Sequence, residues 1–264
     1  MNPIGVFDSG IGGLTVLREI RKVLPHENLT YFADAAHLPY GNKPDVYIRD
    51  RGMHAVTFLV EQGAKAIVVA CNTATALSVA ELRSQFKMPV IAIEPAVKPA
   101  LEQTRSGKIG VLATQGTLQS QRFANLVARF ANNKEVITQP CPGLVEQIEK
   151  GELSGSVTQA LIEQYTRALI QKGVDVIVLG CTHYPFVRSL IEKAAGKNVT
   201  VIDSGLPVAK QLARQLTLQR LTAPASNTSH ERFWTSGPEA QMQLLLDLLW
   251  LKKTVVNRVP EQHR

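Results

Sequence analysis

Two cysteines of the chain have similar surroundings, and thiols can carry acid/base or nucleophilic chemistry. Cys71 follows the apolar residues 67–70, and Cys181 follows the apolar residues 177–180. Each comes just after a predicted buried strand and just before a predicted helix, where backbone dipoles favour a thiolate. Ligands of open α/β sheets bind at this end of the strands. Both cysteines are therefore candidate reactive groups, and the alternative for each alone is a buried structural cysteine.

A pair of thiols suits one class of reaction in particular. Racemisation needs a base on one face of a carbon and an acid on the other, and the two groups must exchange roles in the reverse direction. Thiol and thiolate can do so, provided that the surroundings tune at least one of them from its usual pKa of about 8.5. The carbanion-like transition state also needs hydrogen-bond donors around the substrate carboxylate.

Short polar residues follow the same strands as the cysteines. Asp8 and Ser9 precede a glycine-rich turn at residues 10–13, which could cradle an anion on the next helix. A phosphate loop is the alternative, but the Walker lysine is missing and the glycine spacing differs from the dinucleotide fingerprint. The residues directly after the two cysteines could bind substrate or cap a helix, and these roles are compatible: they are Asn72, Thr73, Thr182 and His183.

His183 lies two residues after Cys181, and an imidazole can exchange a proton near neutral pH. A Cys/His zinc site is the competing idea, but the sequence has neither a C-x-x-C pair nor an H-x-x-x-H pair. We therefore expect no metal. Cys141 lies between two prolines without notable polar neighbours, so we expect it to be structural. Three widely spaced cysteines do not indicate a disulfide framework.

The elements that must position these side chains alternate along the chain, which predicts an α/β fold with mainly parallel sheets covered on both faces. The predicted strands are residues 4–7, 29–33, 66–70, 90–93, 108–112, 135–138, 174–179 and 199–202. The predicted helices are residues 14–24, 45–61, 74–86, 118–130, 156–172, 186–195, 207–218 and 238–251. Residues 222–229 look like a polar loop, and residues 252–264 like a polar, disordered tail.

The chain also repeats itself at an offset of about 105 to 110 residues. Residues 4–9 resemble 109–114, residues 67–73 resemble 177–183, and residues 90–94 loosely parallel 199–203. Three matches in one order predict two related, pseudo-symmetric domains. We expect the first to hold residues 1–96 and about 206–264, and the second residues 97–205. If the two halves face each other, their cysteines approach one active site at the domain interface from opposite sides.

Bulk composition is that of an ordinary globular enzyme, with 45% hydrophobic and 19% charged residues. The formal net charge of +7 comes from scattered Lys and Arg, which indicates a solvated basic surface rather than a nucleic-acid site. Neither a membrane-spanning run nor a signal peptide is visible, so we expect a cytoplasmic protein with no membrane partner.

Four motifs in order resemble the signatures of the glutamate racemases, within the wider aspartate/glutamate racemase superfamily. They are Asp8-Ser9-Gly10-Ile11-Gly12-Gly13, Ala33-Asp34 followed by Pro39-Tyr40-Gly41, Ala70-Cys71-Asn72-Thr73-Ala74-Thr75 and Gly180-Cys181-Thr182-His183-Tyr184-Pro185. The resemblance runs from Gly5 to about Ser204, and the second and fourth motifs favour the glutamate branch.

The resemblance implies a cofactor-independent enzyme that interconverts L- and D-glutamate, without pyridoxal phosphate or metal. It implies that Cys71 takes the α-proton from D-glutamate and Cys181 from L-glutamate, with Asp8 and His183 assisting. The substrate-binding residues that it implies are Asp8, Ser9, Tyr40, Gly41, Asn72, Thr73, Thr182 and His183, with Thr114 and Thr117 as weaker candidates. Asp34 and Glu149 fall where the family keeps additional acidic residues. The match at Glu149 is loose, and Glu152 lies close by in the sequence.

The role implied is the supply of D-glutamate for peptidoglycan in bacterial cytoplasm. Some members carry an N-terminal extension linked to activation by a cell-wall precursor; this chain starts seven residues before Asp8, so we do not expect that activation. Family members often form homodimers of differing arrangement. Three alternatives stay open: a racemase for aspartate or another amino acid, an amidohydrolase with Cys181 as nucleophile and His183 as helper, and association with nucleic acid or gyrase.

Overall fold

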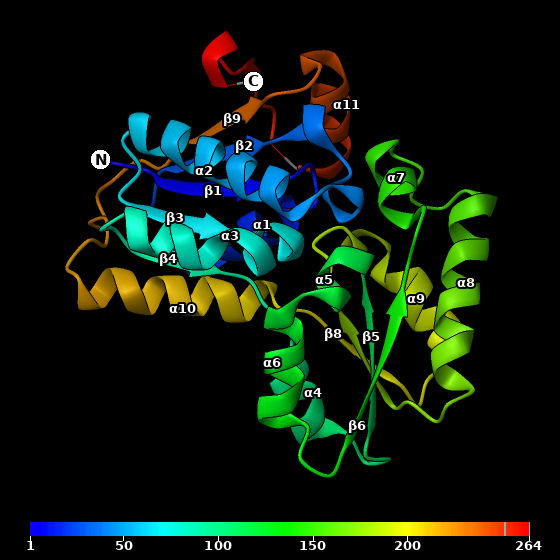
Figure 1. Cartoon of the computed structure of the whole chain (residues 1–264). Helices are drawn as coiled ribbons and strands as arrows, with labels where there is room; N and C mark the ends of the chain where they lie inside the picture. The colour runs from blue at the N-terminus through cyan, green and yellow to red at the C-terminus, as the bar shows by residue number, and fades with distance from the viewer. Residues whose placement is uncertain (251, 264) are drawn as a thin grey trace. The chain divides into compact units, whose positions relative to one another are not determined.

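The computed structural model describes residues 1–250 and 252–263, which form two compact units (Figure 1). Unit 1 comprises Met1–Ile93 and Gly205–Arg264, and unit 2 comprises Glu94–Ser204. Each unit is built on a parallel β-sheet with helices between successive strands. This confirms the predicted α/β class, because strands that are apolar on both faces need helices to cover them.

Unit 1 holds a six-stranded sheet in the order β10-β9-β2-β1-β3-β4. Its strands are β1 (Ile4–Asp8), β2 (Leu29–Ala33), β3 (Ala66–Val69), β4 (Val90–Ala92), β9 (Glu231–Thr235) and β10 (Val256–Arg258). Its α-helices are α1 (Leu14–Val23), α2 (Asp45–Glu61), α3 (Asn72–Gln85), α10 (Gly205–Leu218) and α11 (Glu239–Leu249). Helix α1 packs beside α10, and α2 beside α3. Short 3-10 helices lie at η1 (Ala35–His37), η2 (Tyr40–Asn42) and η4 (Glu261–His263).

Unit 2 holds a four-stranded sheet in the order β6-β5-β7-β8. Its strands are β5 (Lys108–Ala113), β6 (Glu135–Pro140), β7 (Val176–Leu179) and β8 (Thr200–Ile202). Its helices are α4 (Val97–Gln103), α5 (Gln115–Gln119), α6 (Gln121–Phe130), α7 (Leu144–Glu149), α8 (Ser156–Ile170), the 3-10 helix η3 (Tyr184–Val187) and α9 (Arg188–Ala195). Helices α4 and α6 pack together, as do α8 and α9.

The strand order of unit 2 repeats the order β2-β1-β3-β4 of unit 1. Ile67 pairs with Val90 in unit 1, and its sequence counterpart Ile177 pairs with Val201 in unit 2. The repeat in the sequence is therefore also a repeat in sheet topology. The sequence comparison aligned Val90 with Val199, whereas the strand pairing aligns Val90 with Val201. The prediction was wrong by two residues because weakly similar apolar strands can be aligned in more than one register.

Three expectations about helices need correction. The predicted helix at residues 118–130 is two helices, because Ser120 has an extended backbone (ψ 144°) and its hydroxyl accepts from Phe123 N to start α6. The predicted helix at residues 186–195 is the short η3 followed by α9. The sequence also missed α4 and α7, which have seven and six residues and so carry little periodicity.

The carboxyl-terminal segment is ordered where the prediction expected a polar tail. Its strand β10 pairs with β9, Val259 N donates to Thr235 O over 3.0 Å, and His263 Nε2 lies 2.9 Å from a carboxylate oxygen of Glu61. Backbone pairing at the sheet edge orders this short segment, although its polar composition does not predict a strand. The ends of the predicted helix and tail, Leu251 and Arg264, lie outside the described residues.

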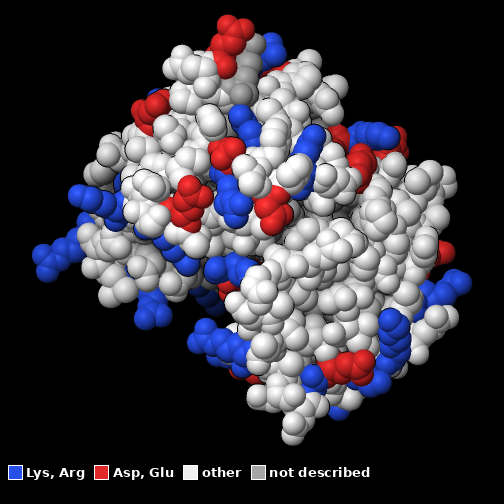
Figure 2. Space-filling model, in the orientation of Figure 1, with Lys and Arg blue, Asp and Glu red and all other residues white. Residues whose placement is uncertain are grey.

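Within the described part of the chain, every helix is too short or too polar to span a bilayer. On the face drawn in Figure 2, Lys and Arg side chains are interspersed with uncharged surface and with Asp and Glu. On this face the basic side chains are therefore dispersed rather than gathered in one stripe.

Candidate active site

Cys71 follows β3 after one residue, Ala70, and is the N-cap residue of α3. Its Sγ lies 3.4 Å from the backbone nitrogen of Ala74, which donates to it, and 3.4 Å from the hydroxyl oxygen of Ser9. The thiol is 5% exposed. Because the first N–H groups of a helix have no partner within the helix, they stabilise negative charge on this sulfur.

Asp8 ends β1, which is the strand next to β3. Its Oδ2 accepts from Gly13 N over 2.6 Å, and its Cβ would lie 2.7 Å from a Cβ at Gly13. A side chain at Gly13 therefore has no room. The sequence predicted that the glycine-rich turn could cradle an anion, and in the structure Gly13 of this turn donates to the chain's own Asp8 carboxylate.

Tyr40 is 2% exposed and lies in the same buried cluster as Cys71. Its hydroxyl donates to Asp34 Oδ2 over 2.6 Å, and Arg51 from α2 donates to the same carboxylate through two nitrogens. Burial and the Asp34 carboxylate raise the pKa of Tyr40 well above its usual value, so its hydroxyl stays protonated. Gly41 follows in the 3-10 helix η2 and is half-buried.

Asn72 and Thr73 open α3 directly after Cys71, with side chains 6% and 3% exposed. Neither Oδ1 nor Nδ2 of Asn72 has a hydrogen-bond partner among the described residues. A buried amide without partners is costly, since both its donor and its acceptor lose water. Asn72 is therefore a strong candidate for contact with a bound polar molecule.

Cys181 occupies the corresponding place in unit 2 but has different neighbours. It follows β7 and Gly180, and it precedes the 3-10 helix η3 rather than an α-helix. The expected support from a helix dipole therefore applies to Cys71 and not to Cys181. Instead, Cys181 Sγ lies 3.6 Å from His183 Nδ1, and His183 Nε2 lies 2.6 Å from Glu149 Oε1.

The imidazole of His183 is 2% exposed and lies between a thiol and a carboxylate. Burial by itself lowers the pKa of His183, but the hydrogen bonds and charges of Cys181 and Glu149 outweigh it and raise the pKa well above 6.5. The ring is therefore protonated near neutral pH and donates from both nitrogens. Glu149 is the acid that reaches His183, whereas the side chain of Glu152 is exposed.

Thr114, Thr117 and Thr182 also lie at the carboxyl ends of the unit 2 strands. Thr114 follows β5 and caps α5, and its Oγ1 lies 2.9 Å from Thr117 Oγ1. Thr182 follows Cys181 and is 3% exposed. Since β5 neighbours β7, these hydroxyls lie at the same sheet edge as Cys181.

Cys141 is buried, as expected, but it does have polar neighbours. Burial raises the pKa of its thiol far above the usual range, while the neighbouring Tyr184 side chain lowers it and the nearby Cys181 raises it further. Cys141 N donates to Ala113 O, just as Asp34 N donates to Asp8 O. Cys141 and Asp34 thus hold the same position in the two sheets.

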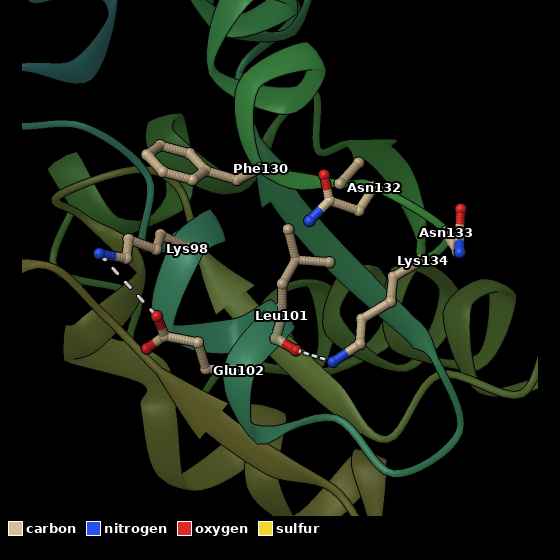
Figure 3. Close-up of a pocket in the computed structure, with 8 residues that line it drawn as sticks. Lys98, Leu101, Glu102, Phe130, Asn132, Asn133 and Lys134 are labelled. Atoms are coloured by element: carbon tan, nitrogen blue, oxygen red, sulfur yellow. Dashed lines mark hydrogen bonds and ion pairs between the residues drawn. The ribbon is translucent and has the colours of Figure 1, made fainter.

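Unit 2 has a hollow of about 390 Å³, and none of the residues singled out by the sequence lines it. Figure 3 shows the side chains that do line it. It lies between α4 and the connection from α6 to β6, at the amino end of β6. Lys98 there lies 3.9 Å from Glu102, and Lys134 donates to the Leu101 carbonyl. The reactive side chains are at the opposite, carboxyl ends of the strands.

Each unit thus gathers its own predicted residues at the carboxyl edge of its sheet. Unit 1 contributes Asp8, Ser9, Tyr40, Gly41, Cys71, Asn72 and Thr73, and unit 2 contributes Thr114, Thr117, Cys181, Thr182 and His183. Sequence reasoning missed Arg51, and it included Tyr184 in a motif without giving it a role. No group of three or more His, Cys, Asp or Glu side chains able to hold a metal ion occurs in residues 1–250 and 252–263.

The Asp/Glu/Hydantoin racemase family matches residues 12–212. A glutamate racemase from Pseudomonas paraeruginosa is 52% identical over 258 residues, covering 97% of each chain. Glutamate racemase RacE1 from Bacillus anthracis is 33% identical, with a TM-score of 0.91 over 99% of this chain and 98% of that one.

Escherichia coli glutamate racemase, solved with L-glutamate and the activator UDP-MurNAc-Ala, is 32% identical, with a TM-score of 0.84 over 94% of this chain and 96% of that one. Both the sequence and the fold therefore agree with the motifs described above. The chain belongs to the Asp/Glu/Hydantoin racemase family of amino-acid racemases, and within it the chain is similar to the glutamate racemases.

Proposed function

We propose that this protein interconverts L- and D-glutamate without a cofactor, with Cys71 and Cys181 as the two acid/base groups. The observation that carries the proposal is the repeat, since both thiols follow the equivalent strand of two sheets with the same strand order. Glutamate as substrate is supported by the 52% identity to a glutamate racemase.

In the proposed reaction, one cysteine acts as a thiolate and removes the α-proton, becoming a thiol. The other cysteine acts as a thiol, gives its proton to the opposite face of the carbanion, and becomes a thiolate. The C–H bond broken on one face is replaced by a C–H bond on the other face, and the S–H bond lost by one cysteine is replaced by an S–H bond on the other. The two sulfurs exchange roles for the reverse reaction. We assign removal of the proton from D-glutamate to Cys71 and from L-glutamate to Cys181, with Asp8 and His183 assisting.

Each thiolate has its own source of stabilisation in this proposal. The Ala74 N–H and the Ser9 hydroxyl support the sulfur of Cys71. The protonated His183, held by Glu149, supports the sulfur of Cys181 and can supply a proton. We assign substrate contact to the unpartnered amide of Asn72 and to polar groups at the carboxyl ends of each sheet. In unit 1 these are Ser9, Tyr40, Gly41 and Thr73, and in unit 2 they are Thr114, Thr117 and Thr182.

The test is to incubate purified, cofactor-free protein with L-glutamate in heavy water and to follow optical rotation and deuterium at the α-carbon. Loss of rotation with deuterium incorporation is the expected result, and aspartate under the same conditions should react far more slowly. Folded, reduced protein that neither exchanges nor inverts glutamate would exclude this function. Faster reaction of aspartate would move the substrate to another branch of the superfamily.

A second function has one specific observation in its favour. Cys181, His183 and Glu149 form a chain of nucleophile, base and orienting carboxylate, as in cysteine hydrolases. An amidohydrolase of this kind would need one cysteine, and it would form an acyl-enzyme. Release of ammonia from glutamine by a Cys71→Ala variant would support hydrolysis, and mass spectrometry of the quenched enzyme would detect the acyl group.

The biological proposal is that the enzyme acts in bacterial cytoplasm and supplies D-glutamate for peptidoglycan. It is supported by the bacterial sources of the similar proteins. Growth of a D-glutamate auxotroph on medium without D-glutamate, after expression of this chain, is the expected outcome. Growth with Cys71→Ala would contradict the link to racemisation.

We also propose that the protein forms a homodimer. Leu244 and Leu248 of α11 lie one turn apart and are 72% and 56% exposed, and Val255 is 72% exposed. Exposed apolar groups of this kind are common in contacts between chains. Analytical ultracentrifugation should show a dimer, and Leu244→Glu should weaken it.

We expect no binding to DNA at physiological salt, because the basic side chains on the face in Figure 2 are interspersed with acidic and uncharged ones.

A further inference from the structure

We propose that Arg51 is a positioning residue for this reaction: through Asp34 it fixes the Tyr40 hydroxyl, and with it the segment of residues 39–41, beside Cys71. The inference rests on the proposed racemase function. Arg51 lies outside all four sequence motifs. It belongs to α2, a helix that contains none of the predicted site residues.

The contacts form a chain from the helix to the thiol. Arg51 Nη2 donates to Asp34 Oδ1 over 2.7 Å, and Arg51 Nε donates to Asp34 Oδ2 over 2.9 Å. The Tyr40 hydroxyl donates to the same Oδ2 over 2.6 Å. Tyr40 packs in the cluster that includes Cys71, and its ring centre lies 6.4 Å from that of Phe7.

Burial makes this arrangement rigid. Asp34, Tyr40 and Arg51 are 0%, 2% and 7% exposed, so water cannot replace a lost partner. Asp34 is also held by its own backbone, because its N–H donates to Asp8 O over 2.9 Å. The two-pronged guanidinium contact therefore fixes the plane of a carboxylate that is already fixed at its backbone.

Tyr40 is held by the packing of its ring near Phe7 and by the hydrogen bond from its hydroxyl to Asp34. Residues 42–46 are exposed, and Tyr40 is the buried residue of the 3-10 helix η2. The Tyr40 hydroxyl is the donor of its bond to Asp34, and the same carboxylate accepts from Arg51. The position of the Tyr40 ring and of Gly41 thus depends on where Arg51 holds the carboxylate.

A purely stabilising role explains this cluster less well. Buried ion pairs recover little more than the cost of removing two charges from water, and apolar residues often replace them without loss of stability. Here the ion pair has a third partner, Tyr40, in a segment next to the reactive sulfur. The geometry therefore points to a function in placing that segment.

The decisive experiment is a double-mutant cycle on glutamate racemisation with Arg51→Lys and Tyr40→Phe. Lysine keeps the charge but loses the forked contact, so we expect KM for glutamate to rise about ten- to hundredfold. Tyr40→Phe should have an effect of similar size. The double variant should be within about twofold of the worse single variant, because both changes break the same chain of contacts.

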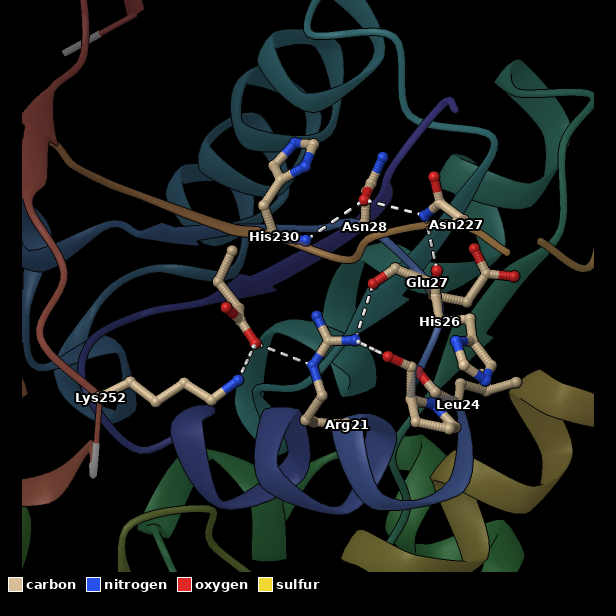
Figure 4. Close-up of polar contacts among 10 residues, drawn as sticks. Arg21, Leu24, His26, Glu27, Asn28, Asn227, His230 and Lys252 are labelled. Atoms are coloured by element: carbon tan, nitrogen blue, oxygen red, sulfur yellow. Dashed lines mark hydrogen bonds and ion pairs between the residues drawn. The ribbon is translucent and has the colours of Figure 1, made fainter. Parts of the chain in front are cut away.

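Figure 4 shows a matched control at the other end of the same sheet. Arg21 Nε lies 2.8 Å from Glu231 Oε1, in an ion pair whose side chains are 14% and 11% exposed. It lies at the amino ends of β2 and β9, away from Cys71. Arg21→Lys should lower the melting temperature while leaving kcat and KM unchanged.

The outcomes separate the inference from the function on which it rests. Wild-type protein that fails to exchange the α-proton overturns the proposed function, and the inference with it. An active wild type with additive effects of the two changes overturns the inference alone, as does Arg51→Lys that lowers the melting temperature with KM unchanged. If Arg51→Lys does not fold, the charge-free Asp34→Asn/Arg51→Met variant takes its place in the same cycle.

Discussion

The two cysteines hold the same position in two sheets of the same strand order, but the groups around them differ. Cys71 starts an α-helix and is contacted by a backbone N–H and a hydroxyl. Cys181 precedes a 3-10 helix and is contacted by an imidazole that a carboxylate holds. Duplication of the backbone has therefore kept the place of the sulfur, while each unit has its own way of stabilising its charge.

The same contrast continues one strand further out. Asp34 and Cys141 follow equivalent strands, and each contacts a tyrosine near its unit's reactive cysteine. Unit 1 uses a charged pair with Arg51 there, whereas unit 2 uses an uncharged thiol and phenol. One strand away from the reactive cysteine, unit 1 thus has a charged pair and unit 2 has a neutral one.

The largest expected effect comes from removing either sulfur. Cys71→Ala and Cys181→Ala should each reduce racemisation by on the order of 10²–10⁴-fold, because a missing acid/base group cannot be replaced on its face of the carbon. Steady-state polarimetry with both enantiomers measures this. Substantial turnover by either variant would break the symmetry of roles that the repeat suggests.

Glu149→Gln should act on Cys181 alone and have a smaller effect. Loss of one charge-assisted hydrogen bond predicts a ten- to hundredfold lower kcat, on the order of 1.5–3 kcal/mol. Because the folded pKa of His183 is raised, its stabilising contribution is complete below about pH 6.5 and is lost as pH rises through the folded pKa. The difference in melting temperature from wild type should accordingly shrink towards alkaline pH.

Cys141→Ala tests whether the neutral neighbour in unit 2 matters for turnover. We expect kcat and KM close to wild type and a loss of about 1 kcal/mol in the free energy of unfolding, as for an average core truncation. Urea denaturation and polarimetry on one preparation measure both. A large loss of turnover in folded protein would give Cys141 a part in positioning Cys181.

The smallest effect is expected at Asp175, which lies away from both sulfurs at the amino end of β7. Burial raises the pKa of Asp175, but hydrogen bonds from Thr104, Arg105 and Ser106 outweigh it and lower the pKa overall. The stability that it contributes is present above about pH 4 and is lost as pH falls through the folded pKa. Asp175→Asn should lower the melting temperature at neutral pH, equal wild type in strong acid, and leave turnover unchanged.

Regular apolar patterns made most of the fold predictable from sequence. Strands β1 and β3 are buried on both faces, so their hydrophobic runs are unmistakable. Strand β9 mixes charged and aromatic residues, and β10 has three residues, so both resemble loops. Their place is set by pairing with β2 and with each other, which local sequence does not encode.

The site was predictable where chemistry follows a strand directly, as at Cys71, Ser9 and His183. The contact between Arg51 and Asp34 was not, because it joins a strand end to a helix interior 17 residues later. Nothing in the spacing selects Arg51 over the neighbouring Arg49. Arg51 can be recognised as the partner of Asp34 only when the structure shows that both side chains are buried.

Unit 1 is interrupted, since Glu94–Ser204 is inserted between β4 and α10. During translation, the whole of unit 2 has been synthesised while β2 still has an unpaired outer edge, because β9 comes later. The nascent first unit also lacks α10 against α1, and Glu27 lacks the Ala223 N–H that it accepts from at 2.7 Å in the finished fold. An open strand edge of this kind invites association with other chains, so the pairing of β9 with β2 also covers an edge that is exposed in the nascent protein.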